Sequence, residues 1–350
     1  MKIAKQALIL ITAALIVIFP DTAQNSIREA IDFVVKSVVP SLFSFMVMSK
    51  IIVNSGTASF IAPIFKPVSR LLHFSKKETA CFIVGNLCGF PSGAAISSDI
   101  SINNKLDRIR ATTLSVASNN VSPAFMISFV GAGLFSSRII GFIIYISQLI
   151  SCVMICAVLR RKITVEDFCN EDKNKSQSFV NIFCKAVSDS AVSSIALSAY
   201  IIVFSVISSY ITIFIKYINA PEILNVFIRS VLEVSSGCSS AVGLPFLISV
   251  AVIAFSCGFS GLSVIFQSAS YLNVAEIKIK DFIIIKIVQG IVASVISAAA
   301  LYFTSISAGI TKSVFSYDIK MHYMYIVAVT LLAAYLFLQI KRIAEIKFSS

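Results

Sequence analysis

Long apolar runs alternate with short polar loops along the whole chain. Six of the runs are continuous, and each is near the ~20 residues that a helix needs to cross about 30 Å of hydrocarbon. They cover residues 6–20, 31–53 (interrupted by Pro40), 139–159, 187–215, 286–309 and 322–340. The pattern therefore predicts an all-α polytopic membrane protein.

Four further segments are apolar but interrupted at mid-depth by polar residues, glycine or proline. In a membrane, backbone groups freed by such breaks are tolerated only where protein or a wet cavity satisfies them. Four breaks therefore predict one shared cavity. The breaks are Asn86 with Gly89–Gly93 in residues 78–102, Ser118–Pro123 in 111–135, Glu233–Gly237 in 222–246 and Cys257–Gly261 in 247–273.

Lysine and arginine gather in short tufts between the apolar runs. This is the positive-inside pattern, so the net charge of +12 indicates orientation in a membrane and not a nucleic-acid surface. Both termini are then cytoplasmic in a multi-pass protein of the cell (inner) membrane. The tufts taken as cytoplasmic lie in residues 66–77, 105–110, 160–185, 278–286 and 341–347, and the charge-poor loops taken as external are 20–30, 132–138, 216–222 and 310–320.

These tufts fit one arrangement of about eight transmembrane helices plus two re-entrant hairpins in two inverted repeats. Such repeats, with broken helices that meet at mid-membrane, recur among transporters. Lys2 and Lys5 before the first apolar run also fit a cleaved signal peptide, although an uncleaved helix is preferred. The expected organisation is an N-terminal transmembrane helix (1–30), a first repeat (31–160), a cytoplasmic linker (161–186), an inverted second repeat (187–310) and a C-terminal helix with a basic tail (311–350).

The broken segments hold the candidate substrate-binding residues. Half-helix N-termini carry partial positive charge and suit carboxylates. Unwound carbonyls and Ser or Asn side chains suit Na⁺, sugar hydroxyls or amides. The alternative is that Ser and Gly only permit close helix packing. The candidates are Asn86, Ser92, Gly93, Asn119, Asn120, Ser122, Ser235, Ser236, Ser260, Ser263 and Gln267.

Glu233 is the carboxylate expected deep in a broken segment. An ionisable residue inside a membrane is a functional hypothesis by default. It could bind a proton, coordinate a cation or accept hydrogen bonds from substrate hydroxyls. The alternative places Glu233 near the outer interface, beside Arg229 on the same helix face.

Enzyme chemistry finds no support in the motifs. No H-E-x-x-H zinc motif, G-x-S-x-G elbow or P-loop occurs, and the two histidines, His73 and His322, lie near the ends of spans. None of the eight cysteines forms a C-x-x-C pair, so no metal or disulfide is expected. Neither a catalytic residue nor a cofactor is predicted, apart from a coupling ion, Na⁺ or H⁺.

Two of the broken segments carry a family resemblance. Residues Gly85–Ala94 and Ser118–Phe125 resemble the nucleoside-recognition, or Gate-domain, membrane family, and most of all its sporulation integral membrane protein type (YlbJ/SpoVV-like). Pro40–Phe43 and Leu232–Gly237 are similar to that type as well, and Cys257–Ser263 is similar to a late broken helix of concentrative nucleoside transporters. The resemblance implies two inverted Gate repeats and a role in spore formation, with dipicolinate moved from the mother cell toward the forespore.

The function expected from these observations is secondary transport of a small organic anion by alternating access. One alternative is a cation-coupled nucleoside or nucleobase permease. Another is a membrane scaffold in spore assembly that transports nothing. The expected partners are a small-molecule substrate and the lipid bilayer, with no nucleic acid, and a homo-oligomer is left open.

Overall fold

The computed structural model describes residues 2–55, 62–159, 178–219 and 221–307, and all regular secondary structure in them is helical. The predicted all-α fold is therefore confirmed for this part of the chain. The helix expected over 322–340, the loop over 310–320 and the basic tail lie outside the described residues.

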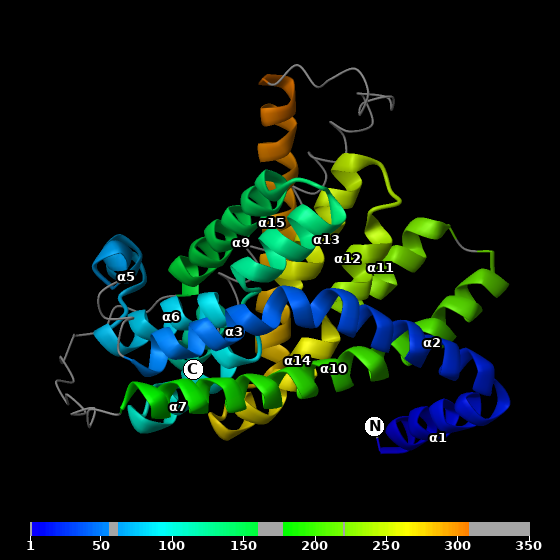
Figure 1. Ribbon diagram of the computed structural model, residues 1–350, viewed down its shortest axis with the longest axis horizontal. Coiled ribbons are helices and arrows are strands. Elements are labelled where there is room, and N and C mark those ends of the chain that lie inside the picture. Colours follow the sequence, from blue (N-terminus) through cyan, green and yellow to red (C-terminus); the bar gives the residue numbers. More distant parts are fainter. Residues whose placement is uncertain (1, 56–61, 160–177, 220, 308–350) are drawn as a thin grey trace, which may run out of the picture.

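The N-terminal helices, up to Asn54, form one layer with a long later helix. After α1 (Lys2–Ile18), α2 (Pro20–Phe33) continues through the π-helix η1 (Val34–Val38) into α3 (Val39–Asn54). α10 (Phe179–Tyr217) packs along both α2 and α3. In Figure 1 these helices run across the view, whereas α15 (Ile279–Ser307) stands upright.

Two boundaries in this layer differ from the expectation. The external loop expected over residues 20–30 is wrong, because Pro20 and Asp21 begin α2; proline in the first turn and an acidic residue near the N-terminus both favour a helix start. The linker expected over 161–186 also ends earlier, because α10 already begins at Phe179.

The π-helix before Pro40 has a simple cause. Proline has no backbone N–H and crowds the preceding turn, so it disturbs the regular hydrogen-bond ladder. One residue earlier, the Val39 N–H donates to the carbonyl of Val34, five residues back. The wider π turn thus leads up to the proline, where the axis bends by 56° between Pro20–Val38 and Leu42–Ile52.

Outside this layer, short helices alternate with long ones in an order that occurs twice. From α3 to α9 and from α10 to α15, a long helix is followed by two short helices that pack against each other, then by two helices separated at a break, then by another long helix. The first set comprises η2 (Ala62–Phe65), α5 (Lys66–Leu72), α6 (Lys76–Cys88), α7 (Ser92–Asn103), α8 (Arg108–Ser118), η3 (Phe125–Leu134) and α9 (Arg138–Leu159), and the second α11 (Glu222–Leu232), α12 (Val234–Ala241), α13 (Phe246–Phe259), α14 (Gly261–Val274) and α15. In the first set, η2 and α5 precede the short pair and have no counterpart in the second set.

The helices have the inside-out polarity of a membrane protein. α9 leaves Ile139, Phe142 and Ile150 exposed on one face while it buries Gln148 and Ser151 on the other. An exposed apolar stripe over a buried polar one suits lipid and not water. The chain is thus an integral membrane protein.

Four helical segments in the described part of the chain are long and apolar enough to cross a bilayer. They are Arg138–Leu159, Phe179–Tyr217, Phe246–Val274 and Ile279–Phe303, and a bent pair, Pro20–Val38 with Leu42–Ile52, would make a fifth. The spans expected beyond these contain short helices or lie in undescribed residues, so the count of eight stays a prediction.

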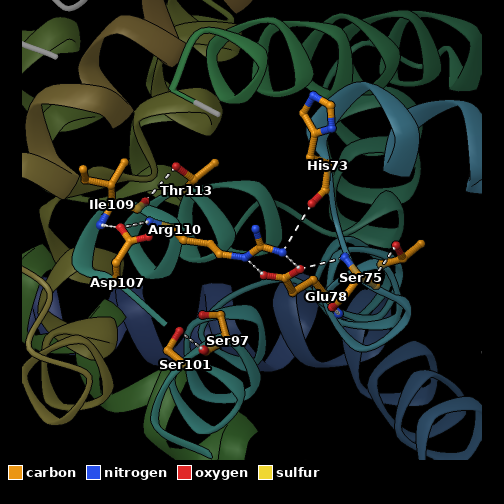
Figure 2. Close-up of polar contacts among 10 residues, drawn as sticks. His73, Ser75, Glu78, Ser97, Ser101, Asp107, Ile109, Arg110 and Thr113 are labelled. Atoms are coloured by element: carbon orange, nitrogen blue, oxygen red, sulfur yellow. Dashed lines mark hydrogen bonds and ion pairs between the residues drawn. The ribbon is translucent and has the colours of Figure 1, made fainter. Parts of the chain in front are cut away.

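An ion-pair network ties the start of α6 to the start of α8. The Ser75 side chain accepts from the backbone of Glu78, and Glu78 accepts from the Ser75 N–H, which forms a capping box. The buried carboxylate of Glu78 also pairs with the guanidinium of Arg110, which donates to the carbonyl of His73 as well (Figure 2). The chain between them, α6 and α7, therefore leaves this end of the molecule and returns to it, as a re-entrant hairpin requires.

A labelling experiment tests this reading of the hairpin. Single cysteines at Lys76 and Lys105, placed in a cysteine-free background, should both react from the cytoplasmic side, because both flank the hairpin at the end that carries basic residues. A cysteine at Gly243, in the exposed connection between α12 and α13, should react from the outside and serves as the orientation control. Labelling of Lys76 and Lys105 from opposite sides would contradict the hairpin.

Candidate functional site

The first hairpin lies directly on the break between α8 and η3. A Cβ atom added at Gly85 or Gly93 would overlap the carbonyl oxygen of Ser118, and one at Gly89 would lie 2.9 Å from the nitrogen of Ser122. Only glycine permits these approaches, and Gly89 also has a φ of +74°, which side chains disfavour. The hairpin is thus held against the interrupted backbone of residues 118–122.

The second half of the chain makes a similar contact. The turn between α11 and α12 lies at Glu233, and a Cβ on Gly261 would lie 3.2 Å from the nitrogen of Val234. Gly261 follows Ser260 at the break between α13 and α14, and both residues have positive φ. Each hairpin turn therefore touches the break of the helix pair that follows it.

Asn120 is the centre of a buried hydrogen-bond network at the first break. Its side-chain nitrogen donates to the carbonyl of Ala117 at 2.9 Å and to Asn86 Oδ1 at 3.1 Å. Its Oδ1 accepts from Lys286 Nζ at 3.0 Å and from Gln289 Nε2 at 2.7 Å. The network thus joins α6 and the end of α8 to α15, the last helix that the structure describes.

Lys286 is fully buried, with 0% exposure, and the expectation that it belongs to a cytoplasmic loop is wrong. α15 begins at Ile279, and Lys286 lies on its inner face with Phe282 and Gln289, whereas Lys280 faces outward. The ammonium donates to the Asn119 carbonyl and Asn120 Oδ1, both at 3.0 Å, and to Gln289 Oε1 at 2.9 Å. A charge that loses water costs free energy unless such partners replace it.

Asn119 continues the polar interior toward the second half. Its Nδ2 donates to Ser268 Oγ of α14 at 3.0 Å, while its Oδ1 is buried without a hydrogen-bond partner. Buried polar atoms without a hydrogen-bond partner are uncommon in folded proteins. Further buried atoms without a partner are Gln148 Oε1 on α9, Ser260 Oγ at the second break and Gln267 Nε2 on α14.

Glu233 is buried, but α12 already occupies its carboxylate. Its Oε1 accepts from the Ser235 N–H at 2.9 Å and its Oε2 from the Ser236 N–H at 2.6 Å. Such bonds make Glu233 the N-cap of α12, where the helix dipole also favours an anion. Arg229 forms no ion pair with it in the described structure; its Nε donates to Thr212 Oγ1 at 3.4 Å.

The remaining candidates lie at or near the breaks. Ser122 Oγ accepts from the Phe125 N–H at 3.3 Å, at the start of η3. Ser92 opens α7 after the cis Phe90–Pro91 peptide and is half-buried. Ser263 is buried in the first turn of α14. The candidates thus divide between the Asn86–Asn120 network and the starts of α7, η3, α12 and α14.

Sequence reasoning missed Lys286, Gln289, Gln148 and Ser268 as interior polar groups. A signal for two of them was present: Lys286 and Gln289 are three residues apart in an apolar run, which puts them on one helix face. The basic residues Lys278 and Lys280 obscure that signal, because Lys286 follows them closely in the sequence.

An all-helical integral membrane protein with a buried polar interior is the class that these features define. The chain is similar to the sporulation integral membrane protein YlbJ of Bacillus subtilis (strain 168), with 23% identity over 328 residues that cover 82% of this chain and 79% of the relative. This similarity confirms the predicted resemblance to the YlbJ-like sporulation membrane proteins. No protein-family model and no solved structure matches the chain, and the link to Gate domains and concentrative nucleoside transporters stays a prediction.

Asn120→Ala tests whether the network holds the interior together. The substitution leaves Asn86, Lys286 and Gln289 each without one buried partner, so the free energy of unfolding should fall by about 3 kcal/mol or more. Thermal unfolding of the detergent-purified protein measures this, with Asn103→Ala at the exposed end of α7 as the matched control. Equal stability of the two variants would contradict a central role for Asn120.

Gly93→Ala tests the contact between hairpin and break. The added methyl group would overlap the Ser118 carbonyl and lie 2.8 Å from the Asn119 Cα, so α7 must shift and the melting temperature should fall. Gly133→Ala is the control, because it is exposed in η3 and its Cβ meets nothing closer than 3.4 Å. If Gly93→Ala is as stable as Gly133→Ala, the hairpin does not rest on the break.

Proposed function

We propose that the protein is a secondary transporter that moves a small organic anion across the membrane by alternating access, with dipicolinate in spore formation as the first substrate to test. The observation that carries the proposal is Lys286. It is a fully buried positive charge at a helix break, surrounded by neutral oxygens.

The arrangement proposed for the whole chain has eight spans and two re-entrant hairpins in two inverted repeats, with both termini in the cytoplasm. The twofold order of long helix, paired short helices, broken helix pair and long helix supports it. The contact of each hairpin turn with the next break supports it further, since broken helices that meet at mid-membrane surround the substrate sites of many transporters.

The charge distribution supports an anion over a neutral substrate. A buried charge with no opposite charge beside it raises the free energy of the folded protein, and an entering anion would offset that cost. Lys286 forms no ion pair in the described structure, and the carboxylate of Glu233 is occupied by the N-terminus of α12. The interior can therefore receive a carboxylate without facing an uncompensated negative charge there.

The relative's name supports a setting for this transport. YlbJ is called a sporulation integral membrane protein, and spore formation is the process in which the proposal places this chain. Dipicolinate fits the proposal chemically, because it is a small aromatic dicarboxylate and the interior offers a cation with amide and hydroxyl groups.

A nucleoside or nucleobase permease is the second candidate. The unpartnered atoms of Asn119, Gln148, Ser260 and Gln267 favour it, because neutral amides and hydroxyls recognise ring nitrogens and sugar hydroxyls. A permease of this kind would use Glu233 as an acceptor for sugar hydroxyls, which requires α12 to release it.

Uptake into proteoliposomes tests the proposal. Radiolabelled dipicolinate, a small aliphatic dicarboxylate and a nucleoside are compared in wild type and in Glu233→Gln. We expect saturable uptake of dipicolinate in both, because the glutamine side chain of the variant still offers one oxygen to cap α12. The cost of the weaker cap should be about 1 kcal/mol of stability.

The opposite outcomes identify the alternatives. Uptake of the nucleoside alone, with affinity reduced by Glu233→Gln, would show that the substrate is a nucleoside and not an organic anion. Uptake of none of the three compounds, in protein whose folding is verified by its thermal transition, would favour a scaffold in spore assembly.

A further inference from the structure

We propose that Lys286 is a built-in cation, whose ammonium group takes the position that a bound Na⁺ would fill at the α8 break. Transport would then need no Na⁺ at this site. The consequence for coupling rests on the proposed function, whereas the occupation of the site by the ammonium does not.

The oxygens around Lys286 are of the kind that binds a small cation. The Asn119 carbonyl is at the C-terminal end of α8, where the helix dipole is negative. Asn120 Oδ1 and Gln289 Oε1 are neutral amide oxygens. Carbonyl oxygens at interrupted helix ends are the ligands that coupling Na⁺ ions take in transporters. In this chain the ammonium occupies them, at 2.9–3.0 Å.

The hydrogen bonds fix the orientation of both amides. The Asn120 Nδ2 donates to the carbonyl of Ala117, which can only accept, so Asn120 Oδ1 must face Lys286. The Gln289 Nε2 donates to that same Oδ1, so Gln289 Oε1 is left to accept from Lys286. Lys286 therefore meets three acceptors, and only the ammonium form has three N–H groups to satisfy them.

The position also explains what a cation does for the fold. Asn86, Asn119 and Asn120 come from the first half of the chain, and Lys286 and Gln289 come from the second. The ammonium links these halves at the break without an ion from solution. A mobile ion would make the same link only while bound, so a built-in cation removes that dependence.

Asn119 supplies a second, independent observation. Its carbonyl binds the ammonium, while its own Oδ1 is fully buried and has no partner. Asn119 thus carries a second buried oxygen at the break, and it accepts no hydrogen bond in the described structure. Removal of the lysine side chain should therefore convert the site into a binding site for a free monovalent cation.

Thermal unfolding of the purified full-length protein tests the inference without any substrate. Wild type, Lys286→Ala and the control Lys280→Ala are compared in sodium, potassium, ammonium, propylammonium and choline chloride at equal ionic strength. Lys280 is exposed on the same helix, so its removal changes charge without touching the site. Propylammonium restores the atoms that Lys286→Ala removes, and choline is too large to enter.

We expect wild type and Lys280→Ala to melt at the same temperature in every salt. Lys286→Ala should melt lower in choline. Its melting temperature should rise in a saturable way with Na⁺ or propylammonium, by about 5 °C at about one hundred times Kd. A Lys286→Ala response identical to that of Lys280→Ala would overturn the inference.

The wild type decides the question even if Lys286→Ala does not survive purification. If Na⁺ raises the melting temperature of wild type above its value in choline, in a saturable way, the inference that Lys286 is a built-in cation is overturned. Equal melting temperatures in the two salts would support the inference. None of these results depends on transport, so a protein that moves no anion can still have the built-in cation. Conversely, Na⁺ stabilisation of wild type would leave anion transport intact.

Discussion

The interaction between Lys286 and the interrupted end of α8 is the one around which the interior is arranged. A lysine with 0% exposure must have every N–H accepted, and three oxygens do so, two from the residues that follow α8 and one from α15. Two of these oxygens are available because α8 ends at Ser118: the Asn119 N–H still donates to Ser115, but the Asn119 carbonyl and Asn120 lie beyond the end of the helix. The break therefore supplies oxygens that stabilise the buried ammonium, and the ammonium in turn satisfies oxygens that the break leaves without a helical partner.

Close backbone contact is the second requirement of this arrangement. The hairpin of α6 and α7 could not reach the α8 break if Gly85, Gly89 or Gly93 carried a side chain. The contact excludes lipid from the broken backbone, where unsatisfied carbonyls would be costly. Asn86, on the same hairpin, then accepts from Asn120 and completes the network. The glycines thus allow the hairpin to approach the break, and the amides satisfy the polar groups there.

The two acidic groups buried in the described interior serve helix starts. Glu78 caps α6 and pairs with Arg110, and Glu233 caps α12 through two backbone N–H groups. Neither is a partner of Lys286, so the positive charge at the first break is not cancelled locally. The charges are separated because both carboxylates lie at helix N-termini, where backbone N–H groups and the helix dipole stabilise an anion. It also gives the interior its preference for an anion in the proposed transport.

The sequence by itself determined the all-helical membrane class and the positions of the breaks, including residues 119–122 and Ser260. Both depend on local composition, because apolar runs must be helical in lipid, and clustered polar residues, Gly and Pro interrupt them at residues 119–122 and at Ser260. Local charge counting failed at Lys286, since a lysine near a basic tuft has the same local signature whether it faces water or the interior. Which face α15 turns inward, and that Asn120 would meet Gln289 across 169 positions of sequence, were decided by packing between distant helices. Only the tertiary structure sets those contacts, because they depend on which buried groups must satisfy one another once water is excluded.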